Sequence, residues 1–241
     1  MKINAWIHIV CIALFLLSGP EVGRAGTRLE QIQTRGTLLC GVASNDPGFS
    51  VAKPDGTYSG LEVDMCRAIA SAIFGSAHYA RFQSVETVHD FLEDPHIDIV
   101  FHRLTWTLTR EAPGQLEFGP VYFHERNRSG RLEPVAPLLR DESKEFSRIV
   151  RWTIFALIDA EDKGLGSNNV DQKASRMNWA PPSTGEALGL DAGWARNLVK
   201  EVGNYGEIVK RHRHSTPTLQ RPRGPNRTVR SGGLLWAPGL S

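Results

Sequence analysis

Three short apolar runs separated by two helix-like segments most constrain how this 241-residue chain can fold. The runs have the length and composition of buried strands, and the segments between them have apolar residues at helical spacing. Such alternation is typical of a doubly wound α/β fold with helices on both faces of a parallel sheet. Ligands then bind beyond the carboxyl ends of the strands, where we expect the segments at 45–49 and 105–110 to converge. The predicted strands and helices alternate over residues 37–42, 64–74, 79–85, 87–92 and 97–101.

Further helices are predicted at residues 29–36, 146–162 and 191–202. The second of these is long and has a broad apolar face, which predicts burial against the sheet. Residues 179–183 are predicted to form a proline-rich loop, and the chain contains no internal repeat.

Residues 1–25 are typical of a secretory signal peptide. Lys2 precedes an apolar run at residues 9–17, and small residues stand three and one positions before a cut after Ala25. The run is too short for a transmembrane helix, so we expect export. The mature chain would keep Cys40 and Cys66, which can pair in an oxidising compartment. Two buried free thiols fit the sequence equally well.

Charge is unevenly placed along the chain. The formal net charge is only +2, which does not indicate a nucleic-acid or membrane partner. No acidic residue follows Glu207, and residues 210–230 carry six arginines and are interrupted by prolines. Interleaved aromatic residues, which nucleic-acid binding would favour, are absent from this basic stretch. We therefore expect residues 210–241 to form a solvated, proline-rich tail without nucleic acid as a partner.

The hexapeptide TWTLTR at residues 105–110, here called the 105–110 loop, is the candidate binding site. It follows the predicted strand at 97–101. Thr105 can offer a hydroxyl and Arg110 a planar fork of N–H donors to one carboxylate. By itself the hexapeptide also fits a polar surface loop whose arginine forms an ordinary ion pair.

Several sequence blocks together resemble the periplasmic substrate-binding components of ABC transporters for polar and general L-amino acids, solute-binding protein family 3. The resemblance runs from about residue 28 to residue 238. It is strongest at residues 35–49, 60–70, 105–110 and 149–158. It implies a type II periplasmic-binding-protein fold, a periplasmic location, a polar L-amino acid and a membrane permease as partners, a monomer and no cofactor.

The resemblance also implies roles for individual residues. Arg110 matches the arginine that binds the substrate α-carboxylate, and Thr105 matches the companion hydroxyl. Trp106 lies within the same motif, and Phe49 matches an aromatic residue that packs on the aliphatic part of the substrate. Just before the motif, where the general amino-acid subgroup tends to read Arg-Asn-Thr, this chain has His102-Arg-Leu104. The resemblance therefore does not predict which amino acid this chain selects.

The chain departs from the family in length between its two crossover segments. Family members have two lobes joined by two crossover strands, which here match residues 119–123 and 133–138. Only residues 124–132 lie between them, and nine residues cannot encode a domain. We expect a hairpin turn there in place of the second lobe. Lobe 1 would then comprise residues 26–123 and 133–209, and the missing lobe should weaken binding.

Other functions also fit the sequence. The same fold hosts cyclohexadienyl-dehydratase-like enzymes, and Asp46, Glu62, Asp64 and His102 could supply an acid and a base. These residues also have simpler structural interpretations, in a turn or at a helix start, so we expect no catalysis. Cys40 and Cys66 lack zinc spacing, and His212 and His214 lie in the expected tail, so we expect no metal site. A permease-docking module and a non-binding remnant are further alternatives.

Overall fold

The computed structural model describes residues 26–111, 115–141, 144–220 and 223–240. The predicted signal peptide therefore lies outside the described residues. A mixed five-stranded sheet forms the centre, in the order β5-β1-β6-β10-β7. Its strands are β1 (Leu38–Val42), β5 (Ala80–Ser84), β6 (Ile99–Phe101), β7 (Leu116–Phe118) and β10 (Leu138–Arg140).

The sheet is parallel at one side and antiparallel at the other. β1 pairs in parallel with both β5 and β6, whereas β10 runs antiparallel to β6 and β7. The predicted strands at 37–42, 79–85 and 97–101 are therefore three parallel neighbours, with β1 in the middle. The mixed sheet with its helices confirms the predicted α/β class.

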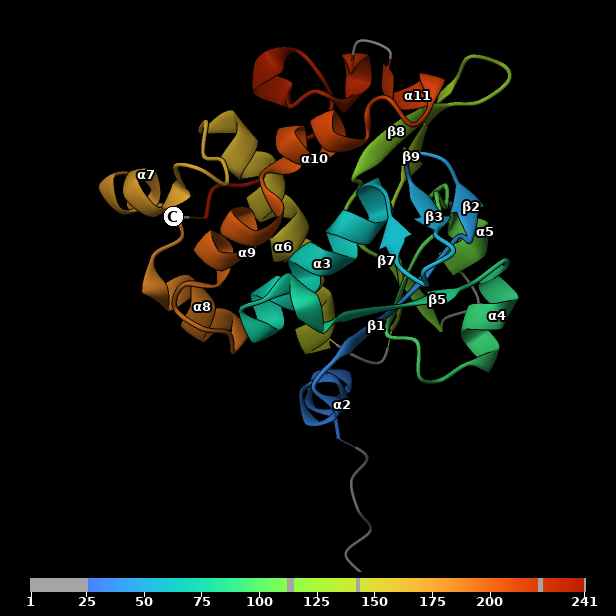
Figure 1. Ribbon diagram of the computed structural model, residues 1–241, viewed down its shortest axis with the longest axis horizontal. Coiled ribbons are helices and arrows are strands. Elements are labelled where there is room, and N and C mark those ends of the chain that lie inside the picture. Colours follow the sequence, from blue (N-terminus) through green and yellow to red (C-terminus); the bar gives the residue numbers. More distant parts are fainter. Residues whose placement is uncertain (1–25, 112–114, 142–143, 221–222, 241) are drawn as a thin grey trace, which may run out of the picture.

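Helices cover both faces of the sheet, with α3 on one side of the strands and α4 on the other in Figure 1. Successive strand residues point to opposite faces, so Ile99 and Phe101 join one apolar cluster while Val100 joins a second, smaller one. The large cluster packs under α3, α6 and α9. The helices are α2 (Arg28–Arg35), α3 (Leu61–Phe74), α4 (Val88–Glu93), α5 (Leu108–Glu111), α6 (Lys144–Asp162), α7 (Val170–Arg176), α8 (Pro182–Leu188), α9 (Trp194–Val202), α10 (Tyr205–His212) and α11 (Pro217–Gln220).

Helix α3 begins three residues before the predicted start. Gly60 has φ 148°, and a Cβ there would lie 2.0 Å from the Phe49 carbonyl oxygen, so the position requires glycine. The amides of Leu61 and Glu62 then donate to the carbonyl oxygens of Gly48 and Phe49. These bonds satisfy N–H groups of the first helical turn and fix the 45–49 turn against the helix.

Two small sheets lie beside the main one. β2 (Asn45–Asp46), β3 (Ser50–Ala52) and β4 (Tyr58–Ser59) form the first. β8 (Phe123–Arg126) and β9 (Leu132–Val135) form the second, in which Phe123 pairs with Val135 and Arg126 pairs with Leu132. Gly130 has φ 81° in the connecting turn, and its amide donates to the Asn127 carbonyl oxygen. The expected hairpin is therefore present between the two crossover segments.

The expectation of a solvated C-terminal tail was wrong. Helix α10 runs past residue 210, and its start is fixed by reciprocal hydrogen bonds between Asn204 and Glu207. Leu219, Leu235 and Leu240 are buried, so these leucines anchor the C-terminal segment to the rest of the protein. Short 3-10 turns continue the chain at Gly224–Asn226 and Val229–Ser231.

Polar contacts also hold the C-terminal segment. His212 Nε2 lies 2.8 Å from Asp64 Oδ2, and Arg211 pairs with the same carboxylate. Arg223 pairs with Glu161 of α6. Burial opposes ionisation of Asp64, but the His212 hydrogen bond and the Arg211 charge outweigh it and lower the pKa of that carboxyl.

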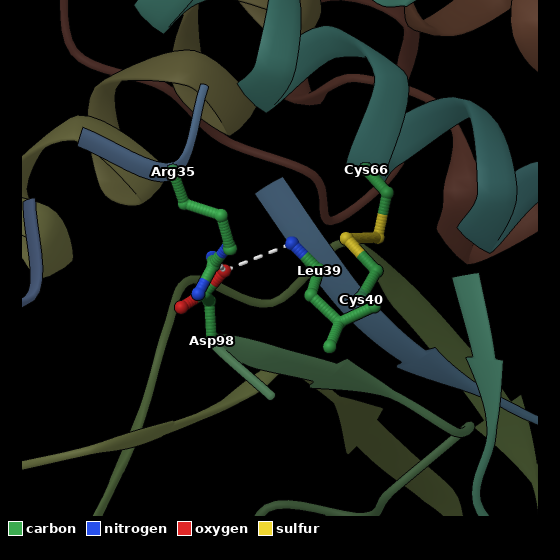
Figure 2. Close-up of a disulfide and its surroundings, with 5 residues drawn as sticks. All are labelled: Arg35, Leu39, Cys40, Cys66 and Asp98. Carbon is green, nitrogen blue, oxygen red and sulfur yellow. Dashed lines mark hydrogen bonds and ion pairs between the residues drawn. A yellow bond between two sulfur atoms is a disulfide. The ribbon is translucent and has the colours of Figure 1, made fainter. Parts of the chain in front are cut away.

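A disulfide and a buried ion cluster join the first helices to the sheet (Figure 2). Cys40 of β1 and Cys66 of α3 form the disulfide. On the other side of β1, Asp98 accepts a hydrogen bond from the Leu39 amide at 2.8 Å and pairs with Arg35. Within the described residues, no helix combines the length and apolar composition that crossing a bilayer requires.

Candidate functional site

The 105–110 loop leaves the carboxyl end of β6, as the sequence predicted. Its first residue, Thr105, forms an isolated antiparallel bridge with Val135 of β9. The last residues fold into the short helix α5. The loop is thus held between the central sheet and the hairpin that joins the crossover segments.

Arg110 is exposed, and its Nη1 donates to the carbonyl oxygen of Thr105 at 2.6 Å. A guanidinium carries five N–H donors, so this one bond leaves others to meet a carboxylate. In the part of the chain that the structure describes, Arg110 forms no salt bridge. The arrangement can present a positive charge to a small anion.

The Thr105 hydroxyl donates to Glu133 Oε2 at 3.1 Å. Hydrogen bonds from Asn127 and Thr105 lower the pKa of Glu133, so this carboxylate is ionised beside the loop. Sequence reasoning missed Glu133, because only the hairpin brings it next to Thr105. The site therefore has an anionic group as well as the cation of Arg110.

The two predicted aromatic residues lie in different surroundings. Trp106 is 40% exposed, stacks on Phe118 and donates from Nε1 to Glu111 at 3.0 Å. It borders a groove of about 450 Å³ that also includes Phe155 and Trp236. Phe49 is fully buried and lies beneath the guanidinium of Arg103. The structure thus brings Thr105, Trp106 and Arg110 together but covers Phe49.

Three of the four residues considered for acid and base chemistry are engaged in structural contacts, whereas Nε2 of the fourth, His102, is buried without a hydrogen-bond partner among the described residues. Asp46 pairs with Arg103, and Asp64 is buried against Arg67, Arg211 and His212. Glu62 is fully buried, where its Oε1 accepts from the Tyr122 hydroxyl and the Arg103 amide. Among the described residues, no cluster of three or more potential ligands is placed to hold a metal ion.

Burial raises the pKa of Glu62 to about 7, although the Tyr122 and Arg103 hydrogen bonds act in the opposite direction. The unfolded chain would titrate near the ordinary value of 4.5. Between pH 4.5 and pH 7, Glu62 is therefore protonated in the folded state but ionised in the unfolded chain. The free energy of unfolding should fall as the pH rises through this range.

We expect Glu62→Gln to remove this pH dependence. Relative to the wild type, the variant should gain about 2–3 kcal/mol in unfolding free energy between pH 5 and pH 8. Urea unfolding at both pH values measures this gain, with the exposed Glu145→Gln as the matched control. Parallel stability profiles for the wild type and Glu62→Gln would show that Glu62 does not titrate in this window.

Comparison with known proteins agrees with this architecture. The family model for bacterial extracellular solute-binding proteins, family 3, matches residues 38–158, which is half of the chain. The putative amino-acid ABC transporter-binding protein YhdW of Escherichia coli O157:H7 is 26% identical over 335 residues, covering 96% of this chain and 98% of the relative. The general L-amino acid-binding periplasmic protein AapJ of Rhizobium johnstonii is 25% identical over 328 residues, with 94% and 96% covered.

A solved structure shows the same fold. An ABC transporter periplasmic binding protein from Brucella ovis, solved with glutathione bound, superposes with a TM-score of 0.81 at 23% identity. The match covers 90% of this chain and 100% of that one. The alignment to YhdW, at 335 residues, is longer than this whole 241-residue chain, which fits an internally shortened protein. The chain belongs to the bacterial extracellular solute-binding proteins of family 3, among relatives named as amino-acid ABC transporter-binding proteins.

Proposed function

We propose that this chain is a periplasmic amino-acid-binding protein that holds the α-carboxylate of a polar L-amino acid at Arg110, with weak affinity. Its partners would be that amino acid and the membrane permease of an ABC transporter. The proposal includes export through residues 1–25, a monomeric state and no catalytic activity. The relatives named for amino-acid transport support the ligand class and the partner.

The observation that carries the proposal is the contrast between two arginines near the end of β6. Arg103 is neutralised by Asp46 and Glu125. Arg110 instead lies exposed and bonded to a neutral carbonyl oxygen. Arg110 is close enough to Glu133 for its charge to lower the pKa of that carboxyl, but it forms no salt bridge among the described residues, so its N–H donors can meet the carboxylate of a ligand.

Glu133 strengthens the amino-acid assignment. A free amino acid carries an ammonium group beside its carboxylate, and it needs an acceptor near the cation that holds the carboxylate. Glu133 supplies that acceptor next to Thr105. A simple carboxylic acid would gain from Arg110 but would be repelled by Glu133, so the pair favours zwitterions over simple anions.

Weak binding follows from the absence of a second lobe. We infer that residues 124–132 replace that lobe, and the long alignment to YhdW and the direct β8–β9 pairing support this inference. Without an opposing surface the ligand stays in contact with water. An exposed arginine–carboxylate pair contributes only about 0–1 kcal/mol, so we expect a Kd of about 1 mM or weaker.

Calorimetry with L-glutamine, L-asparagine and L-glutamate tests the role of Arg110. Saturable millimolar binding should weaken by up to about fivefold in Arg110→Ala, because an exposed arginine–carboxylate pair contributes at most about 1 kcal/mol. The exposed Arg176→Ala on α7 serves as the matched control and should bind like the wild type. Unchanged binding in Arg110→Ala would refute the assignment of the carboxylate site.

The surroundings of Asp64 do not favour a role for this residue as a catalytic acid or base. Asp64 is only 2% exposed and is shared by three cationic or titratable side chains, those of Arg67, Arg211 and His212. Its tight pairing suits a role in attaching α10 to α3. Turnover of a cyclohexadienyl acid that disappears in Asp64→Asn would establish the enzyme alternative instead.

A further inference from the structure

Residues 225–236, here called the 225–236 loop, fold back on themselves near the end of the chain. Thr228 forms an isolated parallel bridge with Leu235. A Cβ at Gly233 would lie 2.0 Å from the Arg227 carbonyl oxygen, so the two arms of the loop pack closely against each other. The loop is therefore a folded element, and its backbone determines which side chains face the solvent.

Side chains on the two arms of the loop alternate between the protein interior and the solvent. Thr228 and Leu235 are buried. Their neighbours Val229, Leu234 and Trp236 are 50%, 51% and 60% exposed. Among the described residues, three of the eight exposed large apolar side chains therefore lie in this one loop. Apolar side chains gathered in this way on a surface are typical of a site that contacts a partner or a membrane.

Positive charge accompanies these apolar side chains. Residues 208–241 contain no Asp or Glu. Arg223 pairs with Glu161 of α6. Arg227 and Arg230 of the loop are exposed, and within the described part of the chain neither forms a salt bridge. The loop thus presents two unpaired cations next to exposed apolar groups.

The β8–β9 hairpin adds a further cation beside the loop. β8 and α11 lie side by side in Figure 1, and residues of both line one groove. Arg126 of β8 borders this groove together with Pro225 and Asn226, and it is exposed. The neighbouring Glu125 is already paired with Arg103, so it does not neutralise this end of the molecule.

We propose that the 225–236 loop is a docking surface for an anionic lipid bilayer. Its arginines meet the lipid phosphates, and its exposed apolar side chains enter the headgroup region, where a tryptophan ring is especially favourable. The net charge of +2 for the whole chain hides this local concentration of cations. The inference goes beyond the proposed amino-acid binding at Arg110 and does not depend on it.

Co-sedimentation with vesicles tests the role of the arginines. The vesicles contain phosphatidylcholine with about 30% phosphatidylglycerol, at about 50 mM salt. Arg227→Ser, Arg230→Ser should weaken binding about 25-fold, because each cation near an anionic surface contributes about a factor of five. The matched control Arg176→Ser, Arg196→Ser makes the same charge change at exposed positions of α7 and α9 and should bind like the wild type. Residues 1–25 are common to all these chains, so a difference between variants reports on the loop.

Trp236 gives a second, spectroscopic readout. Its ring contacts Phe155 of α6 edge to face, with centroids 6.1 Å apart, and remains mostly open to solvent. Trp236→Ser should weaken vesicle binding about tenfold, because the loop loses its largest apolar side chain. Trp236→Phe should bind like the wild type but show a smaller blue shift of tryptophan emission when vesicles are added.

Equal vesicle binding by the two double-arginine variants would overturn the proposal, because the loop would then not be the contact with lipid. A dimer in vesicle-free solution that dissociates in Trp236→Ser would also overturn it, since a second copy of the chain would then cover the loop. Sedimentation equilibrium of the wild type and Trp236→Ser without lipid measures this second outcome.

Discussion

Replacing Asp98 by alanine is expected to lower the free energy of unfolding by about 3–5 kcal/mol, because it removes one partner of a buried ion cluster. The Asp98 side chain is fully buried, pairs with Arg35 and lies 3.6 Å from Arg28 Nη1. It also accepts the Leu39 amide hydrogen bond at 2.8 Å (Figure 2). The carboxylate therefore ties α2 to the start of β1.

A second variant, in which an exposed carboxylate is removed, serves as the control for the effect of burial at Asp98. Asp171→Ala breaks a salt bridge to Lys200 in which both side chains are more than half exposed. We expect this change to cost at most about 1 kcal/mol, because water screens the pair. Urea unfolding of both variants at neutral pH gives the comparison. Equal losses would contradict the structural role assigned to Asp98.

Removing the disulfide is expected to destabilise the folded chain by about 3 kcal/mol. Cys40 and Cys66 are 26 residues apart, and the bond restricts the unfolded chain between them. Both residues are fully buried between β1 and α3, so the double substitution Cys40→Ala, Cys66→Ala should leave the sheet and helix in place. The loss of stability then comes mainly from the greater conformational freedom of the unfolded chain.

Unfolding curves with and without dithiothreitol measure this effect. The wild type should lose stability on reduction, whereas the double alanine variant should not respond. A wild type that is equally stable in both conditions would show that the bond does not form in solution. The outcome also bears on export, since structural disulfides persist mainly in oxidising compartments.

Much of the central lobe could be predicted from the sequence, because its signals are local. The strand at 97–101 and the helix ended by Asp94 and Pro95 follow from apolar runs and a proline. The hairpin at β8–β9 followed from the short spacing of two recognisable segments. Each of these features is contained within a few consecutive residues.

The C-terminal segment was misread because its anchors follow no periodic pattern. Leu219 stands alone between polar residues and close to Arg221 and Arg223, and the apolar residues at 234–237 form no helical or strand pattern, so the sequence predicts solvent exposure for both. The sequence did contain one signal. Asn204 is followed three residues later by Glu207, and this capping-box pattern predicts the start of α10. The salt bridges of Arg103 with Asp46 and Glu125 had no such signal, because only the fold brings these residues together.

Titration of the isotopically labelled protein with L-glutamine, followed by amide NMR shifts, tests the central claim most directly. The account predicts fast-exchange shifts centred on residues 105–110, saturating with a Kd of about 1 mM or weaker. No saturable shift up to about 50 mM, or saturating shifts centred away from Arg110, would contradict amino-acid binding at this loop. Micromolar binding would instead contradict the conclusion that the missing lobe weakens the site.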